Sequence, residues 1–185
     1  MPLPIPVPRE ELHQRRVDLR GYRRADGLYD IEAHLVDTKR EAFTAHSEST
    51  VPPGTPIHDM SVRLVVDADL RVIDVVASTD ASPYSICCDA TATLRSIRGL
   101  RIGTGWSKAI AERLAGRKGC THLTELLKPL ATVAFQTLSK VRAARAAAID
   151  VNVRPSKIDS CFAYASDREL VRRRWPTHYT GSGET

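Results

Sequence analysis

Residues 62–78, VRLVVDADLRVIDVVAS, contain two runs of β-branched residues on either side of a short acidic segment. In the first run Val62, Leu64 and Val66 alternate with their neighbours, so they share one face of a strand. The Asp-Ala-Asp segment between the runs favours a tight turn. The stretch therefore predicts a β hairpin, which is the clearest structural signal in the chain.

The segments on either side of this hairpin indicate a further strand and several helices. Residues 29–39, YDIEAHLVDTK, alternate apolar and polar side chains, as a half-buried strand does. Apolar residues then recur every three or four positions within 87–100, 105–116 and 121–148, which predicts helices. Pro129 is expected to kink or delay the last helix. Strands followed by helices predict an α+β fold, in which helices cover a small antiparallel sheet that includes the β hairpin.

Length and composition limit the class of protein. A chain of 185 residues with 42% hydrophobic and 26% charged residues is typical of one globular domain, expected here over 13–178. Residues 1–12 are proline-rich and predict an extended arm, and residues 179–185 predict a disordered tail. No run of about 18 apolar residues indicates a membrane span. Prolines interrupt the N-terminus, where a signal peptide needs an apolar helix, so we expect a cytoplasmic protein.

The net charge of +5 does not by itself indicate nucleic-acid binding. Basic residues cluster within 13–24 and 168–175, but aromatic residues make up only 5% of the chain. We therefore expect a small-molecule substrate, with neither nucleic acid nor membrane as partner, and leave a homo-oligomer open. The four cysteines of a chain that is not secreted are expected to be free thiols or metal ligands.

Polar residues that can take part in catalysis or metal binding lie at the junctions between predicted elements. Such junctions are where a rigid scaffold presents functional groups. His58 and Asp59 precede the first hairpin strand, and Cys120 precedes the longest predicted helix. Cys87 also precedes a predicted helix, and its neighbour Cys88 can take its place. The start of a helix favours a thiolate, which binds metals and attacks electrophiles. For any one of these cysteines, a buried and inert thiol is the simpler interpretation.

Taken together, these residues predict a small metalloenzyme. His58, Cys87 and Cys120 would bind Zn²⁺ or Fe²⁺, since thiolate and imidazole suit both ions. We expect three residues to transfer protons, namely Asp59, His122 and Glu125. We expect four others to contact the substrate, namely Tyr22, Arg23, Arg24 and Tyr84. Because the chain has no nucleotide-binding loop and no GxSxG elbow, we expect a lyase. Elimination or retro-aldol cleavage of a small aromatic or carboxylated molecule fits best.

Two other functions remain open. One is a non-catalytic scaffold or carrier for an iron–sulfur cluster or for zinc, which needs exposed ligands and a surface for a partner. The other is a cofactor-free enzyme in which Cys120 is the nucleophile or acid and His122 or His58 is its base. A structural domain with buried thiols is the simplest alternative.

The order of these residues resembles that of iron–sulfur scaffold proteins of the NifU/IscU type over residues 54–140. Asp59 matches the aspartate of that family, Cys87 or Cys88 its second cysteine, and Cys120 its third. The resemblance implies an iron–sulfur-scaffold-like fold. The place of the first cysteine is taken by Ile57. His58 or His122 would then be substitute ligands.

A closer resemblance covers nearly the whole chain. The stretches RRADGLYDIEAHLVDTK, GTPIHDMSVRLVVD, SPYSIC, GCTHLTELL and DSCFAY are similar to those of a bacterial family known only as a domain of unknown function. This resemblance implies that the five motifs contribute to one site. It implies no reaction.

Overall fold

The computed structural model describes residues 3–44, 50–147 and 154–181. Contacts divide the chain into two compact units, residues 1–140 and 141–185, which are described separately below. We expected one domain over 13–178. Most of the predicted tail, 182–185, lies outside the described residues.

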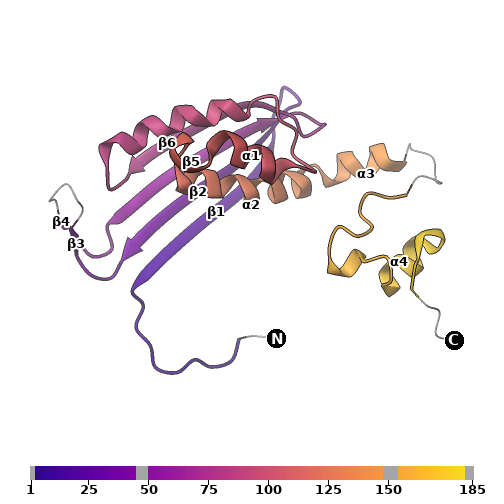
Figure 1. The fold of residues 1–185 in the computed structure, drawn as a ribbon, viewed down its shortest axis with the longest axis horizontal. Coiled ribbons are helices and arrows are strands. Elements are labelled where there is room, and N and C mark those ends of the chain that lie inside the picture. Colours follow the sequence, from indigo (N-terminus) through magenta and orange to yellow (C-terminus); the bar gives the residue numbers. More distant parts are fainter. Residues whose placement is uncertain (1–2, 45–49, 148–153, 182–185) are drawn as a thin grey trace. The chain divides into compact units, whose positions relative to one another are not determined.

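A four-stranded antiparallel sheet organises the first unit (Figure 1). Its strands follow the order β1-β2-β5-β6, and β3 and β4 form a separate two-stranded sheet. The strands are β1 (His13–Arg23), β2 (Tyr29–Lys39), β3 (Phe43–Thr44), β4 (Thr50–Val51), β5 (Pro56–Val66) and β6 (Val72–Ala81). The predicted α+β class and the predicted hairpin, formed by β5 and β6, are confirmed. The likeness to an iron–sulfur scaffold stays a prediction.

The hairpin turn is closed by Asp67, whose Oδ1 accepts hydrogen bonds from the backbone N–H groups of Asp69 and Arg71. Leu70 adopts a left-handed backbone conformation in this turn, with φ of 63°, and its side chain is buried. Burial of the leucine offsets the strain of this conformation.

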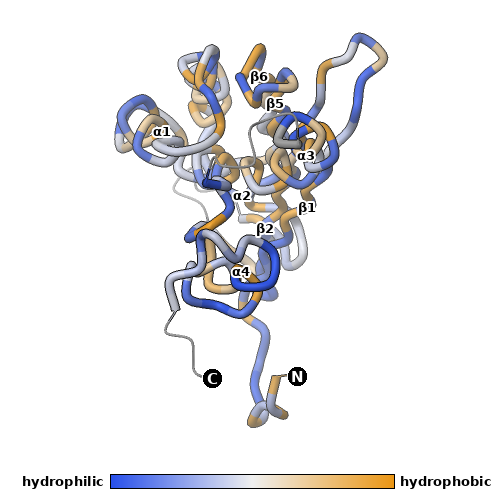
Figure 2. The backbone as a smooth tube through the Cα atoms, turned by 90° about the vertical axis from the view of Figure 1, so that its right-hand side faces the viewer, coloured by the Kyte–Doolittle hydropathy of each residue, from blue (hydrophilic) through white to orange (hydrophobic). Residues whose placement is uncertain are grey.

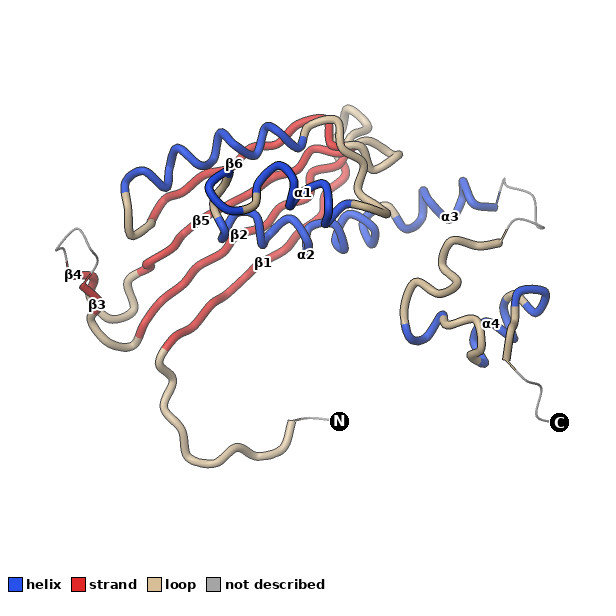
Figure 3. The backbone as a smooth tube through the Cα atoms, in the orientation of Figure 1, coloured by secondary structure: helices blue, strands red, loops and turns tan. Residues whose placement is uncertain are grey.

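Helices cover one face of the sheet (Figures 1 and 3). They are η1 (Ser85–Ile97), a 3₁₀ helix, with α1 (Trp106–Leu114), the short 3₁₀ turn η2 (Gly116–Lys118) and α2 (Thr121–Thr137). The helix η1 packs on β6, whereas α2 packs on β1, β2 and β5. Trp106 joins α1 to α2 because its indole N–H donates to the Leu127 carbonyl at 3.0 Å.

The hydrophobic core lies between this helical layer and the sheet. Alternate residues of β2, among them Ile31 and Leu35, meet the apolar face of α2, where Leu123 and Leu130 are buried. The helix α2 continues through Pro129, so the proline does not delay its start. Where α2 ends, Thr137 lies so close to Gly21 of β1 that any Cβ at Gly21 would overlap its hydroxyl.

The second unit is small. It contains part of α3 (Ser139–Ala147), together with η3 (Phe162–Tyr164), α4 (Glu169–Arg174) and η4 (Pro176–His178). The DSCFAY segment closes on itself, since the N–H of Asp159 donates to the Tyr164 carbonyl and the Asp159 carboxylate accepts from Ser166. The arginine-rich α4 is predominantly hydrophilic (Figure 2). Among the described residues, no helix combines the length and the apolar character that a membrane span requires.

Candidate metal centre

A single row of side chains crosses three neighbouring strands near one end of the sheet. Arg15 of β1 is paired with Asp37 of β2, and Asp37 is paired with His58 of β5. The row continues the alternation of buried Leu35 and Met60, so it faces the helices. The pairing of β2 with β5 shifts register directly after Asp37. Such irregularities are common next to functional sites.

Asp37 is at the centre of the row and is only 1% exposed. Arg15 donates to both of its oxygens, from Nε to Oδ1 at 2.8 Å and from Nη2 to Oδ2 at 2.7 Å. Nδ1 of His58 lies 3.0 Å from Oδ2, and Nε2 of His13 lies 3.1 Å from Oδ1. Burial alone would raise the pKa of Asp37, but the hydrogen bonds from Arg15 and His58 outweigh it and lower that pKa. Asp37 is therefore an ionised acceptor surrounded by donors.

The start of α2 brings a second histidine to this row. The rings of His58 and His122 lie 3.8 Å apart at their centroids, tilted by 34°. Burial lowers the pKa of both imidazoles, and repulsion from His122 lowers that of His58 further. Since the Asp37 carboxylate only accepts, Nδ1 of His58 carries its proton, which leaves Nε2 with a free lone pair. Neutral imidazole is the form that binds metal ions.

Two further side chains of the α2 start border the histidines. Glu125 lies on the same helical face as His122, and its Oε2 accepts from Nη1 of Arg15 at 3.2 Å. Sγ of Cys120, which precedes the first residue of α2, lies 3.9 Å from Nδ1 of His122. One end of α2 thus supplies an imidazole, a carboxylate and a thiol.

Asp37, His58 and His122 meet the basic requirement for a metal site. Each offers one ligand atom, and the three atoms lie within 4.8 Å of one another. Ligand atoms about 2.1 Å from one tetrahedral ion are roughly 3.4 Å apart, so the three side chains would have to move closer together to bind one ion. Two imidazoles and a carboxylate suit both Zn²⁺ and Fe²⁺. Among the described residues, neither Cys87 nor Cys120 belongs to such a group.

Comparison with known proteins places the whole row within one family. The model of a family described as a protein of unknown function, DUF2889, matches residues 13–136. The chain belongs to this family. No curated protein and no solved structure matches it. The span shared with DUF2889 runs from the first residue of β1 almost to the end of α2, and it includes every residue of the row but not the DSCFAY motif.

In this DUF2889 chain the structure brings together four of the residues singled out in the sequence. They are His58, Cys120, His122 and Glu125. Asp59 lies elsewhere, because successive residues of a strand point to opposite faces. Its Oδ1 is 2.7 Å from Nε2 of His34 on the face of the sheet that the helices leave open.

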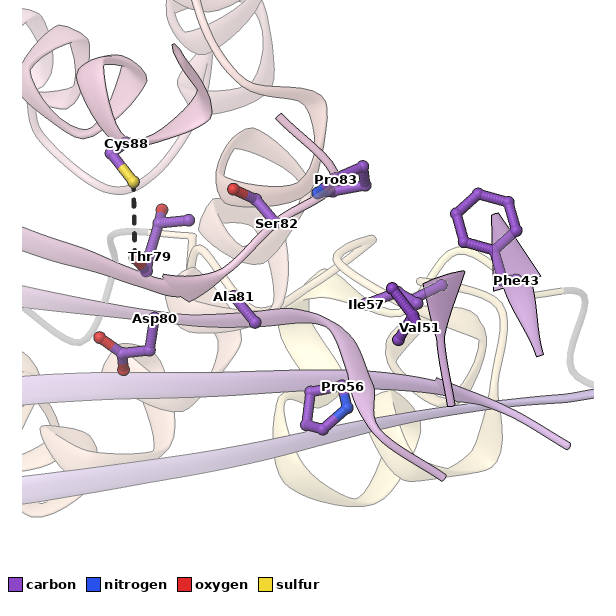
Figure 4. Close-up of a pocket in the computed structure, with 10 residues that line it drawn as sticks. All are labelled: Phe43, Val51, Pro56, Ile57, Thr79, Asp80, Ala81, Ser82, Pro83 and Cys88. Carbon is purple, nitrogen blue, oxygen red and sulfur yellow. Dashed lines mark hydrogen bonds between the residues drawn. The ribbon is translucent and has the colours of Figure 1, made fainter. Parts of the chain in front are cut away.

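Cys87 and Tyr84 lie around the start of η1 and not on α2. The helix η1 packs on β6. The neighbouring thiol of Cys88 donates to the Thr79 carbonyl at 3.7 Å and borders a pocket of about 250 Å³ (Figure 4). Ile57 lines this pocket, whereas the next residue, His58, contacts Asp37. The pocket is therefore next to the row but separate from it. Cys161 belongs to the second unit, so the implied contribution of the DSCFAY motif to one common site stays a prediction.

The other expected substrate residues lie away from the row. Arg23 and Arg24 follow Arg15 by eight and nine positions, which corresponds to roughly 26–30 Å of extended chain. Arg24 forms ion pairs with Asp26 and Asp30 at the turn between β1 and β2. Tyr22 lines a shallow depression on the open face of the sheet.

Sequence reasoning missed Arg15, Asp37 and His13. Asp37 could have been found, because it continues the alternation of the apolar positions 29, 31, 33 and 35. This position predicts a buried carboxylate, which needs hydrogen-bond partners. Arg15 gave no such signal, because it is a charged residue two positions before the apolar pair Val17 and Leu19. Its strand is exposed at nearly every position, and its apolar alternation is limited to Val17 and Leu19.

Proposed function

We propose that this chain is a metal-dependent enzyme that binds Zn²⁺ or Fe²⁺ through Asp37, His58 and His122. The observation that carries the proposal is the approach of three potential ligand atoms to within 4.8 Å at the covered face of the sheet. The lowered pKa of both histidines supports it, since each imidazole is neutral near pH 7 and available as a ligand. Three protein ligands leave a coordination position for substrate.

The proposed reaction is that of a cytoplasmic lyase, by elimination or retro-aldol cleavage of a small molecule. A metal ion acting as a Lewis acid would polarise a carbonyl or hydroxyl oxygen of the substrate. Glu125 borders the histidines and is 58% exposed at its side chain, so it would exchange a proton between substrate and solvent. Burial favours this enzyme over a scaffold, because a carrier must present its ligands to a partner and the His58 side chain is only 12% exposed.

Metal analysis of protein purified without a metal-affinity column tests the proposal. We expect about one zinc or iron per chain in the wild type, and its loss in His58→Ala and His122→Ala. His34→Ala is the matched control, because His34 also pairs with a carboxylate but lies on the open face. A wild type without metal, or a His58→Ala variant with full metal content, would refute the proposal.

One contact favours a second candidate, the cofactor-free cysteine enzyme. Cys120 lies directly before α2 with its Sγ 3.9 Å from Nδ1 of His122, which is the pairing of a nucleophile with its base. Alkylation by iodoacetamide tests it, with the exposed Cys161 as the internal reference. Faster alkylation of Cys120 than of Cys161, abolished by His122→Gln, would support a reactive thiolate. Equal or slower alkylation would indicate an inert thiol.

A further inference from the structure

Arg15 is hydrogen-bonded to the Asp37 carboxylate, which the proposed metal ion would need as a ligand. Two oxygens of Asp37 offer about four acceptor positions. Two donors of Arg15, one of His58 and one of His13 approach these oxygens at 2.7 to 3.1 Å. An ion that binds Asp37 directly must therefore displace at least one of these donors.

The exposure and charge of the three donor residues indicate which one gives way. The His58 side chain is 12% exposed and stacks on His122, so it is held in place. Arg15 and His13 are more accessible, at 35% and 44%. Arg15 alone carries a permanent positive charge, which a bound cation repels. It is also held from its other side, since Nη1 contacts Glu125.

We propose that Arg15 is the substrate-binding residue of this metal site and takes a carboxylate of the substrate. Once the metal ion has bound Asp37, Nε and Nη2 of Arg15 lose their partner while Nη1 stays with Glu125. The freed edge of the guanidinium already fits a carboxylate, because it holds Asp37 by two parallel hydrogen bonds at 2.8 and 2.7 Å. A carboxylate substrate would thus bind between the metal and Arg15. This inference rests on the proposed metal site.

Titration of the metal-free protein with Co²⁺, followed by its visible absorption, tests the first step. We expect Arg15→Gln to bind Co²⁺ at least about tenfold more tightly than the wild type, because a charged competitor for Asp37 is gone. Arg20→Gln is the matched control, since Arg20 holds Asp18 through the same two nitrogens on the open face. Its Co²⁺ affinity should equal that of the wild type. An unchanged or weaker affinity in Arg15→Gln would overturn the inference.

Acetate, the simplest carboxylate, tests the second step on the Co²⁺-loaded protein. A saturable spectral change is expected in the wild type and in Arg20→Gln, with an at least tenfold weaker acetate affinity in Arg15→Gln. Arg15→Lys keeps the charge without the fork and should also bind acetate more weakly, which secures the test if Arg15→Gln does not fold. Equal acetate affinity in the wild type and the variants would overturn only the proposed role of Arg15 and not the metal site. A wild type that does not bind Co²⁺ would instead refute the metal site itself.

Discussion

Replacing Asp37 by asparagine should destabilise the fold far more than the same change at Asp59. The change removes the charge from a side chain that is 1% exposed and that faces only donors. The amide oxygen keeps one acceptor, but the amide nitrogen meets donor groups of Arg15 or His58. Each hydrogen bond to a charged group contributes about 1.5–3 kcal/mol. Because the Arg15 side chain is 35% exposed, water replaces part of this, and we expect a loss of about 2–4 kcal/mol.

Asp59→Asn is the matched control for this prediction. Asp59 directly follows His58 in β5, but its side chain is 27% exposed and its partner His34 is 50% exposed. Exposed ion pairs contribute about 0–1 kcal/mol, so the control should stay close to the wild type. Urea unfolding of the metal-free proteins, followed by far-UV circular dichroism, measures both free energies of unfolding. If Asp37→Asn lost no more stability than Asp59→Asn, the hydrogen bonds of Asp37 would contribute no more to the fold than those of an exposed ion pair.

Three other changes probe the fold and the site. Gly21→Ala should lower the free energy of unfolding by about 1–3 kcal/mol, because the new Cβ overlaps Thr137, and a second change, Thr137→Ala, should restore most of the loss in urea unfolding. In the metal-free protein the melting temperature should fall as the pH is lowered from about 7.5 to about 5.5. The pKa of His58 and of His122 is lowered from 6.5 in the folded state, so the unfolded chain binds protons first. A rise of the melting temperature on acidification would contradict this. Deletion of residues 1–8 should leave the melting temperature nearly unchanged, because the described residues of this arm are exposed, and a large drop would show that the arm packs on another surface.

Elements with one apolar face could be predicted from the sequence. The strand over 29–39 was predicted with the bounds of β2, and α2 starts at the predicted residue. In both, the spacing of buried residues follows directly from the geometry of the element. His122 and Glu125, three positions apart in α2, lie on one helical face for the same geometric reason.

The edge strand and the partners within the site could not be predicted in the same way. On β1 the positions that face the helices near the row are His13 and Arg15, whose charge hides the alternation of a strand. Asp59 and Cys87 both lie near junctions between elements, where site residues were expected. Strand alternation turns Asp59 to the open face, and η1 places Cys87 over β6. Sequence position does not reveal which elements become neighbours, because pairing depends on contacts between distant segments.

The arrangement of Arg15, Asp37 and His58 in one cross-strand row has a consequence for how the gene can vary. A one-residue insertion or deletion within β1, β2 or β5 would turn the side chains beyond it to the other face and so remove a member of the row. Length changes in the segments 24–28 and 40–55, the second of which contains β3 and β4, leave the pairing of β1, β2 and β5 intact. Natural variation in length among related sequences should therefore accumulate in these two segments, and the lengths of β1, β2 and β5 should stay constant.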